Sequence, residues 1–342
     1  MRSVLVALLL LPTSTTAQEV TDVITVERIL IDARVTDYDG DPILGLTVAD
    51  FDVRVGGKRA VIESVEWIPE TEAARAIAAF DEEPRGAGED TRARKGRLFL
   101  YFVQTDFARN SVRVRGHMKF MHYAEQMIEA LEEHDRVAVF SFDSHLKFRL
   151  DFTADKSDII HALRQAVLTD NPSWPPLVPN PSLARRLDRD EMKRFTSSDE
   201  AFIHIANAVR HIPGPKSMIL FGWGLGQLSG NQVVMHRKYP IARRALEQAR
   251  VTVFSLDTTD ADYHDLEFGL GTAAKDTGGF YAKTHIFPQI AVARLQKTLA
   301  GHYELEVRRP AGLRPGTHEI DVRVKRRGTY VMARSTFMDE PR

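Results

Sequence analysis

Acidic side chains follow two of the apolar stretches in this sequence, at positions where buried strands are expected to end. Asp143 comes directly after one such stretch, with His145 two residues on, and Asp257 and Asp260 follow another. Paired carboxylates with a nearby imidazole can perform general acid–base catalysis, as in many hydrolases. No nucleophile or metal motif accompanies them, so an envelope hydrolase is the alternative hypothesis rather than the main one.

The glycines of Gly222-x-Gly224-x-Gly226 follow another apolar stretch. Their spacing differs from the dinucleotide-binding pattern G-x-G-x-x-G, and no helix start or distant acidic residue completes that pattern. The sequence contains no H-E-x-x-H, G-x-S-x-G or Walker motif, and its 12 histidines show no metal-ligand spacing. We therefore predict no cofactor, and we expect the glycines to form a tight loop beside Trp223.

The composition excludes further classes of function. Among 342 residues, 46 Lys and Arg face 47 Asp and Glu, and 43% are hydrophobic. Without a basic surplus the chain is not expected to bind nucleic acid, because that binding depends on displaced counterions. The absence of cysteine excludes disulfides, thiolate metal sites and a cysteine nucleophile.

The first 17 residues are expected to be a signal peptide. A short basic start precedes the apolar run Val4–Leu11, and Thr15-x-Ala17 fits the small-x-small cleavage rule. The run is too short to cross a bilayer, which needs about 20 residues. We expect a mature chain from Gln18 that is secreted or periplasmic and has no transmembrane span.

Hydrophobic patterning divides the rest of the chain into blocks. Residues 23–68 show the alternation and turn signals of about five short strands, and residues 69–96 are mixed in charge, as in a solvated linker. From residue 97, apolar strands alternate with helices, which predicts an α/β fold with a doubly wound, mainly parallel sheet. The expected organisation is a signal peptide (1–17), an N-terminal β module (18–68), a linker (69–96), an α/β domain (97–300) and a C-terminal β segment (301–342).

Three local expectations can be checked against a structure. Residues 147–152 alternate cleanly, which predicts an edge strand with one face in water. Residues 155–167 are expected to be helical, with Thr153 as the cap, and residues 264–275 are expected to form a later helix.

The β segments at the two ends are each too poor in apolar positions to fold alone. Small hairpins are marginal in water, so Ile31 and Val53 near the start and Ile320 and Val322 near the end need a cover. We expect the two segments to form one small β-sandwich with the α/β domain inserted between them.

One long motif carries a family resemblance. Residues 35–53 match the run V-T-D-x-x-G-x-P-V-x-G-L-T-x-x-D-F-x-V almost position by position, and Thr277-Gly278-Gly279 fits a later T-G-G step. On these residues the chain resembles the secreted proteins with a von Willebrand factor type A domain found in Acidobacteria-type genomes. The resemblance implies a Rossmann-like α/β domain that takes part in adhesion or protein–protein interaction.

The metal-ion-dependent adhesion site of such domains is degenerate here. Its D-x-S-x-S motif aligns with Gln104-x-Asp106-x-Ala108, its fourth-strand acid aligns with Trp223, and Thr196 is the candidate for its loop hydroxyl. A site that lacks these oxygen ligands is not expected to hold Mg²⁺ in the family manner. An unconventional site that uses Asp106 and Asp257 stays open.

The main hypothesis is a non-catalytic secreted or envelope protein that binds a protein partner without metal. The rim loops are expected to present Asp106, Phe107, Trp223 and Leu225 to that partner, and an exposed aromatic amid polar loops is a common interface anchor. The alternative for Trp223 is that it folds inward as core. A structural envelope component without a ligand is a third possibility. The predicted binding rim consists of Gln104, Asp106, Phe107, Asn110, Ser111, Trp223 and Asp257.

Overall fold

The computed structural model describes residues 28–81, 96–105, 108, 110–168, 170–179 and 181–339. The predicted signal peptide and the strand expected over residues 23–26 lie outside this range. Within it, no helix is both long and apolar enough to cross a membrane.

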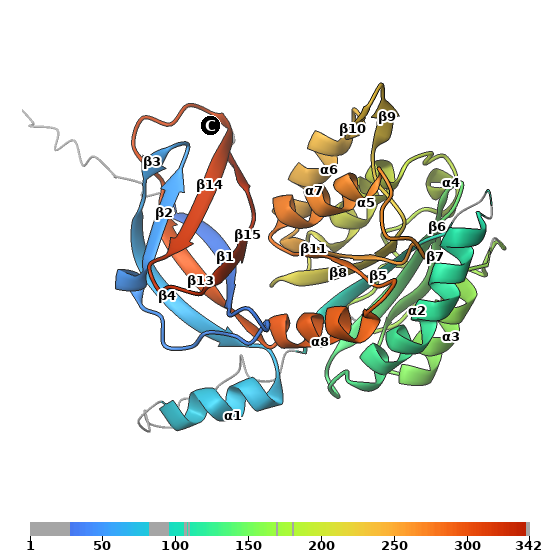
Figure 1. Cartoon of the computed structure of the whole chain (residues 1–342), viewed down its shortest axis with the longest axis horizontal. Helices are drawn as coiled ribbons and strands as arrows, with labels where there is room; N and C mark the ends of the chain where they lie inside the picture. The colour runs from blue at the N-terminus through green and yellow to red at the C-terminus, as the bar shows by residue number, and fades with distance from the viewer. Residues whose placement is uncertain are drawn as a thin grey trace, which may run out of the picture.

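A six-stranded sheet forms the centre of one unit, in the order β12-β11-β8-β5-β6-β7 (Figure 1). All neighbours pair in parallel except β6 and β7, which are antiparallel. The predicted α/β fold class, with a mainly parallel sheet, is therefore confirmed. The strands are β5 (Leu98–Gln104), β6 (Arg136–Phe142), β7 (Leu146–Thr153), β8 (Lys216–Gly222), β11 (Val251–Asp257) and β12 (Tyr281–Lys283).

Helices cover both faces of this sheet because the strands are apolar on both sides. Leu100 and Phe102 of β5 belong to one core cluster, and Phe99 and Tyr101 belong to the other. The first cluster is covered by α5 (Ser198–Val209), α6 (Tyr239–Gln248) and α7 (Glu267–Thr277), and the second by α2 (Ser111–Glu129), α3 (Lys156–Ala166) and α8 (Pro288–Thr298).

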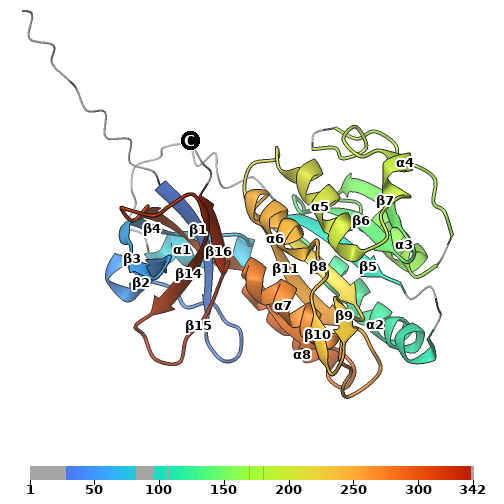
Figure 2. The same cartoon turned by 90° about the horizontal axis from the view of Figure 1, so that it is seen from above.

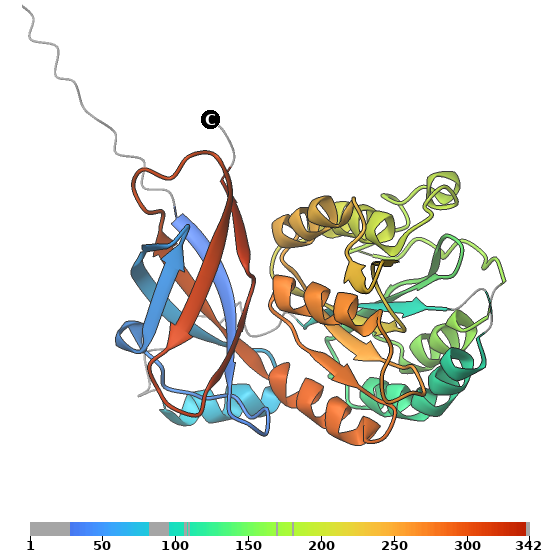
Figure 3. The same cartoon turned by 45° about the horizontal axis from the view of Figure 1, so that its top comes forward.

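Strands from both ends of the chain build a second unit beside the first, as Figures 1 and 3 show. Its two four-stranded sheets run β15-β1-β13-β4 and β16-β14-β2-β3 and share one core, in which Ile31 pairs with Leu305 and Val53 with Val322. The predicted sandwich of N- and C-terminal strands is confirmed as part of the fold class. Its strands are β1 (Arg28–Thr36), β2 (Phe51–Val55), β3 (Lys58–Arg59), β4 (Val61–Pro69), β13 (Gly301–Arg308), β14 (Gly316–Val324), β15 (Tyr330–Ala333) and β16 (Thr336–Asp339).

Strand β7 lies at the edge as predicted, but the expectation of one wet face is wrong. Lys147, Arg149 and Asp151 are all buried. Lys147 Nζ lies 2.7 Å from Asp143 Oδ2, and Arg149 Nη2 donates to Asp170 Oδ1 at 2.9 Å. Asp151 accepts hydrogen bonds from residues 182–184, so the loop that follows α3 bends over the polar face of β7 and provides partners for Arg149 and Asp151.

Two short helices, a hairpin and the 3-10 helix η1 (Val48–Asp50) complete the described chain. Helix α1 (Glu72–Asp81) lies in the range predicted as linker, where the backbone N–H of Glu72 and the guanidinium of Arg75 both donate to the Glu132 carboxylate. Helix α4 spans Arg189–Met192. Strands β9 (Gln227–Ser229) and β10 (Gln232–Val234) pair as a hairpin, seen beside α7 in Figure 2, that the sequence analysis did not predict.

Helix caps show a smaller difference. Asp155, not Thr153, caps α3, because its Oδ1 accepts from the backbone N–H groups of Ser157 and Asp158. The helix predicted over 264–275 begins instead at Glu267 and ends at Thr277.

Candidate functional site

Three adjacent strands end together at the carboxyl edge of the parallel sheet. Gln104 ends β5, Gly222 ends β8 and Asp257 ends β11. This edge is where ligands bind in open α/β sheets, because loops there leave the sheet in opposite directions.

Gln104 is 4% exposed and bridges β5 to the loop after β8. Its Oε1 accepts from the backbone N–H of Trp223 at 3.0 Å and of Gly224 at 3.2 Å. Its Nε2 donates to the Gly224 carbonyl at 2.7 Å and to Ser198 Oγ at 3.3 Å. The carboxamide thus joins the two strand ends with three hydrogen bonds and is tied to α5 by the fourth.

Trp223 is half-buried. Its exposure is therefore intermediate between that of an exposed anchor and that of a core residue, the two alternatives considered from the sequence. The guanidinium carbon of Arg113, on α2, lies 3.6 Å from the centre of the Trp223 ring, a cation–π contact. The expectation that Leu225 is presented to a partner is wrong, because Leu225 is buried in the core. A Cβ on Gly224 would lie 2.4 Å from the Cβ of Leu266. The glycine therefore lets this loop lie against the start of α7.

The remaining predicted rim residues have mixed positions. Asn110 caps α2, with its Oδ1 accepting from the N–H of Val112, and Ser111 is exposed at the first position of that helix. Asp106 and Phe107 lie outside the described residues.

Asp257 is buried and satisfied by its neighbours. Its Oδ2 accepts from His264 Nε2 and from the Tyr281 hydroxyl, both at 2.8 Å, and its Oδ1 accepts from the N–H of Thr259. Burial opposes the charge, but the hydrogen bond and charge of His264 outweigh it and lower the pKa of this carboxyl.

Two groups of side chains have the composition of a metal site. Asp257, His264 and Glu267 bring three ligand atoms within 4.8 Å of one another, and so do Asp32, His302 and Glu304 in the other unit. In the first group, Lys283 Nζ lies 2.7 Å from Glu267 and already supplies a positive charge.

The four residues considered for acid–base catalysis do not form one site. Asp143 is paired with Lys147, whereas Asp260 is paired with Arg115 and Lys119. Hydrogen bonds to Lys119, His285 and Arg115 lower the pKa of Asp260 to about 2. Asp143 follows β6 and Asp257 ends β11, three strand spacings apart in the sheet order, or about 14 Å at ~4.8 Å per spacing.

The structure also shows a residue that the sequence analysis missed. Asp199, in the first turn of α5, is 1% exposed, and neither carboxylate oxygen has a hydrogen-bond partner within the described part of the chain. Burial raises its pKa to about 6. Its neighbour Ser198 contacts Gln104, whereas the predicted loop hydroxyl of Thr196 is exposed and bonds to Glu200.

No family model matches the chain, and no curated protein is similar to it in sequence. Several solved structures are similar in fold. A von Willebrand factor type A protein from Catenulispora acidiphila is 10% identical over 85% of this chain and 72% of that one, with a TM-score of 0.41.

Two bacterial surface-related structures match a smaller part of the chain. An aerotolerance-related membrane protein from Bacteroides fragilis is 13% identical over 59% of this chain and 98% of that one, with a TM-score of 0.39. The von Willebrand factor domain of the type V pili tip protein Mfa5 from Porphyromonas gingivalis is 12% identical over 59% and 94%, with a TM-score of 0.36. Proteins with von Willebrand factor type A domains are thus among the solved structures that this chain resembles in fold.

Proposed function

We propose that this chain is a non-catalytic secreted or envelope protein that binds a protein partner at the carboxyl edge of its parallel sheet, without a metal ion. The observation that carries this proposal is the Gln104 carboxamide at the centre of that edge. It makes three hydrogen bonds from the end of β5 to the loop after β8, and a fourth to Ser198 of α5.

The chemistry of this edge supports metal independence. A hard divalent cation takes several oxygen ligands, mostly carboxylates. Here Gln104 is uncharged and already bonded on both its oxygen and its nitrogen, and Trp223 offers no oxygen side chain. The nearest strand-end carboxylate, Asp257, is engaged by His264 and Tyr281.

The exposed chemistry of the same edge supports a protein partner. Aromatic and arginine side chains are enriched among the residues that dominate binding energy at interfaces. Trp223 is half-buried with Arg113 stacked on it, so a large apolar ring is held in one orientation. The exposed Ser111 and the cap residue Asn110 provide a polar border.

The test is capture of partners from an envelope extract of the native host, with and without EDTA. Trp223→Ala is the test variant, and Tyr38→Ala, an exposed aromatic in the sandwich loop, is the control. Partners should be captured equally in EDTA and in Mg²⁺ by the wild type and by Tyr38→Ala, and lost with Trp223→Ala. Capture that requires Mg²⁺, or that survives Trp223→Ala, contradicts the proposal.

Secretion is tested separately, from the mature N-terminus. Protein recovered from the periplasm or the medium should begin at Gln18 by mass spectrometry, whereas an intact Met1 contradicts the predicted cleavage.

A further inference from the structure

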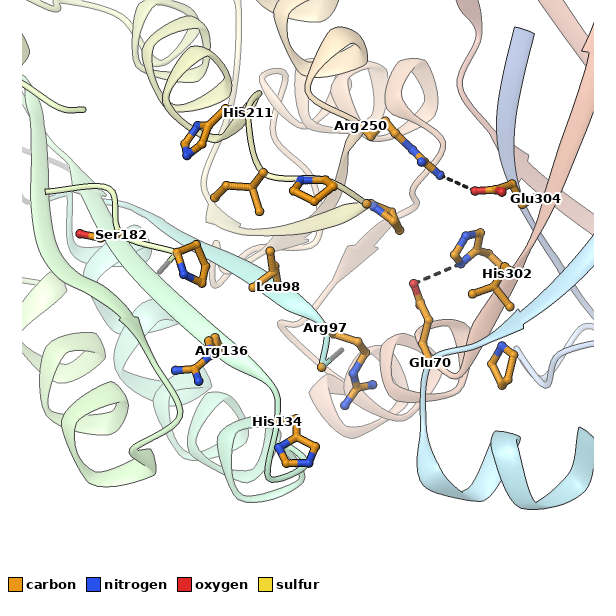
Figure 4. A pocket seen from close by; sticks show the side chains of 18 of the residues that line it. Glu70, Arg97, Leu98, His134, Arg136, Ser182, His211, Arg250, His302 and Glu304 are labelled. Atoms are coloured by element: carbon orange, nitrogen blue, oxygen red, sulfur yellow. Dashed lines mark hydrogen bonds and ion pairs between the residues drawn. The ribbon is translucent and has the colours of Figure 1, made fainter. Parts of the chain in front are cut away.

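A large cleft lies at the opposite, amino edge of the parallel sheet, where it faces the β-sandwich. Its volume is about 1130 Å³, at the upper end of small-molecule sites. Leu98 and Arg136, at the starts of β5 and β6, line one wall, and Glu70, His302 and Glu304 of the sandwich line the other (Figure 4). The cleft is therefore well separated from the rim proposed to bind a partner.

The lining of the cleft is strongly basic. It includes six arginines and two glutamates. Both glutamates are already engaged, because Glu70 Oε1 lies 3.1 Å from His302 Nδ1 and Glu304 Oε2 lies 2.9 Å from Arg250 Nη2. The six arginines are Arg75, Arg97, Arg136, Arg185, Arg186 and Arg250.

Half of these arginines have no acidic partner among the residues that the structure describes. Arg75 pairs with Glu132, Arg97 with Asp135, and Arg250 with Asp32 and Glu304. Within the described residues, Arg136, Arg185 and Arg186 make no ion pair, and all three are exposed at the cleft. Three arginines without an ion pair in the described part of the chain therefore line one concave surface.

A buried lysine under the same surface adds a further positive charge. Lys216 is 3% exposed, and its Nζ donates only to the backbone carbonyls of Ile212 and Ala249. Burial, helped by repulsion from Arg250, lowers the pKa of Lys216 to about 8. Ile212 and the residues up to Pro215 line the cleft, so an anion bound there would lie above the Lys216 ammonium group.

We propose that this cleft binds a small polyanion that carries two or more phosphate or carboxylate groups. The planar guanidinium group can donate two parallel N–H···O hydrogen bonds to one phosphate or carboxylate group. A lysine ammonium group is a point charge and lacks this matching geometry. Several separated arginines favour a ligand with more than one anionic group over a single ion. The apolar side chains of Ile68, Leu98 and Ile212 would contact its carbon portion.

The experiment is calorimetric titration of the full mature chain with pyrophosphate, citrate and sulfate. The test variant is Arg185→Gln/Arg186→Gln, which removes two exposed charges and no ion pair within the described residues. The control is Arg326→Gln/Arg327→Gln, an adjacent exposed pair in the sandwich with the same change in net charge. Partner capture by the rim is measured in parallel.

The wild type and the control should bind pyrophosphate or citrate at least tenfold more tightly than sulfate, with affinity falling as salt rises. The test variant should lose at least tenfold in affinity while partner capture at the rim is unchanged. Preference for pyrophosphate over citrate, or the reverse, distinguishes a phosphate ligand from a carboxylate ligand. Equal binding of all three anions, or an equal loss in both double variants, overturns the proposal.

Discussion

Gln104 shows how one uncharged side chain can stabilise the edge of a parallel sheet. Its carboxamide satisfies two backbone N–H groups and one carbonyl of the loop after β8, and that loop carries Trp223. Because these backbone groups lie in the interior, they depend on Gln104 rather than on water. The orientation of Trp223 is therefore linked to a residue on a different strand.

Replacing Gln104 with Ala should destabilise the protein by about 2–4 kcal/mol, because several buried backbone groups lose their partners. Urea denaturation of the variant measures this loss. Gln126→Ala, on the exposed side of α2, is the matched control and should change stability by about 0.5 kcal/mol or less. An equal effect of both substitutions would show that the bridge seen at Gln104 does not stabilise the loop.

Asp199 should make stability depend on pH in an unusual direction. Its pKa is about 6 in the folded protein and 3.8 for a free side chain, so the folded state binds a proton more tightly than the unfolded state. Stability from this group is therefore greatest below pH 4 and decreases as pH rises from about 4 to about 6. The loss above pH 6 is on the order of 3 kcal/mol.

Asp199→Asn should be more stable than the wild type at pH 8 and lose this advantage towards pH 4. Urea denaturation at both pH values gives the difference, in which the contributions of the other carboxyl groups cancel. Asp158→Asn, also in the first turn of a helix but exposed, is the control and should show no such gain. A pH-independent difference for Asp199→Asn would mean that Asp199 titrates normally.

The sequence predicted where the central strands end better than it predicted the contacts made at those ends. The ends of β5, β8 and β11 could be placed because continuous apolar runs end at Gln104 and Asp257. The partners could not, because Gln104 bonds to a loop 120 residues away and Asp257 to His264 and Tyr281 from separate elements. Asp199 gave no signal, because an acidic residue in the first turn of a helix is usually exposed.

At the scale of elements, the turn after α6 contains the one described non-glycine residue with a positive φ. Arg250 has a φ of 52°, in the left-handed region where glycine commonly follows a helix. Its side chain explains why arginine is found there: Nε lies 3.0 Å from Asp32 Oδ2 on β1, and Nη2 lies 2.9 Å from Glu304 Oε2 on β13. The strained turn thus aims a guanidinium at the neighbouring sandwich.

Both Arg250→Ala and Arg250→Gly should lower the melting temperature, because Asp32 and Glu304 lose their shared cation. The glycine variant should nevertheless be more stable than the alanine variant by about 1 kcal/mol, since only alanine retains the backbone strain. Thermal unfolding of the two variants side by side measures the difference. Equal stabilities would mean that the positive φ is not strained.

Helices and strands were predictable where apolar residues recur in the sequence with the regular spacing of a helix or a strand. Residues 239–248 form α6 as predicted, and the runs within β8 and β11 were correct to within a residue at each end. Errors arose where tertiary contacts decide the outcome. Helix α1 has its first backbone N–H bonded to Glu132, and the polar face of β7 is buried by a loop some 20–30 residues later in the chain.

At the scale of the whole molecule, the two units are joined by more than the chain. Besides Arg250, Glu247 accepts from the N–H of Met338, and Asp276 accepts from the Ser335 hydroxyl, so α6 and α7 are bonded to the region of β16. We propose that the α/β unit, residues 97–300, is a domain inserted between the halves of the sandwich.

This arrangement predicts what truncation will do. A chain that ends at Ala300 lacks β13, β15, β14 and β16, so β1 loses both neighbouring strands and β2 loses its partner in five register pairs. The apolar side chains of β1 and β2, such as Ile31 and Val53, would then face water. The remaining sandwich strands cannot form a core alone, because isolated two-stranded pairs are marginal in water.

Hydrogen exchange of the truncated and full-length chains, read by mass spectrometry, tests this. Peptides from β1, β2 and β4 should be protected in the full chain and exchange rapidly after truncation. Peptides from β5, β6 and β8 serve as the internal control and should stay protected. Their neighbouring strands and the helices that cover them all precede residue 300. Protection of β1 and β2 in the truncated chain would mean that the N-terminal strands form a core by themselves, and that the α/β unit follows a complete domain rather than interrupting one.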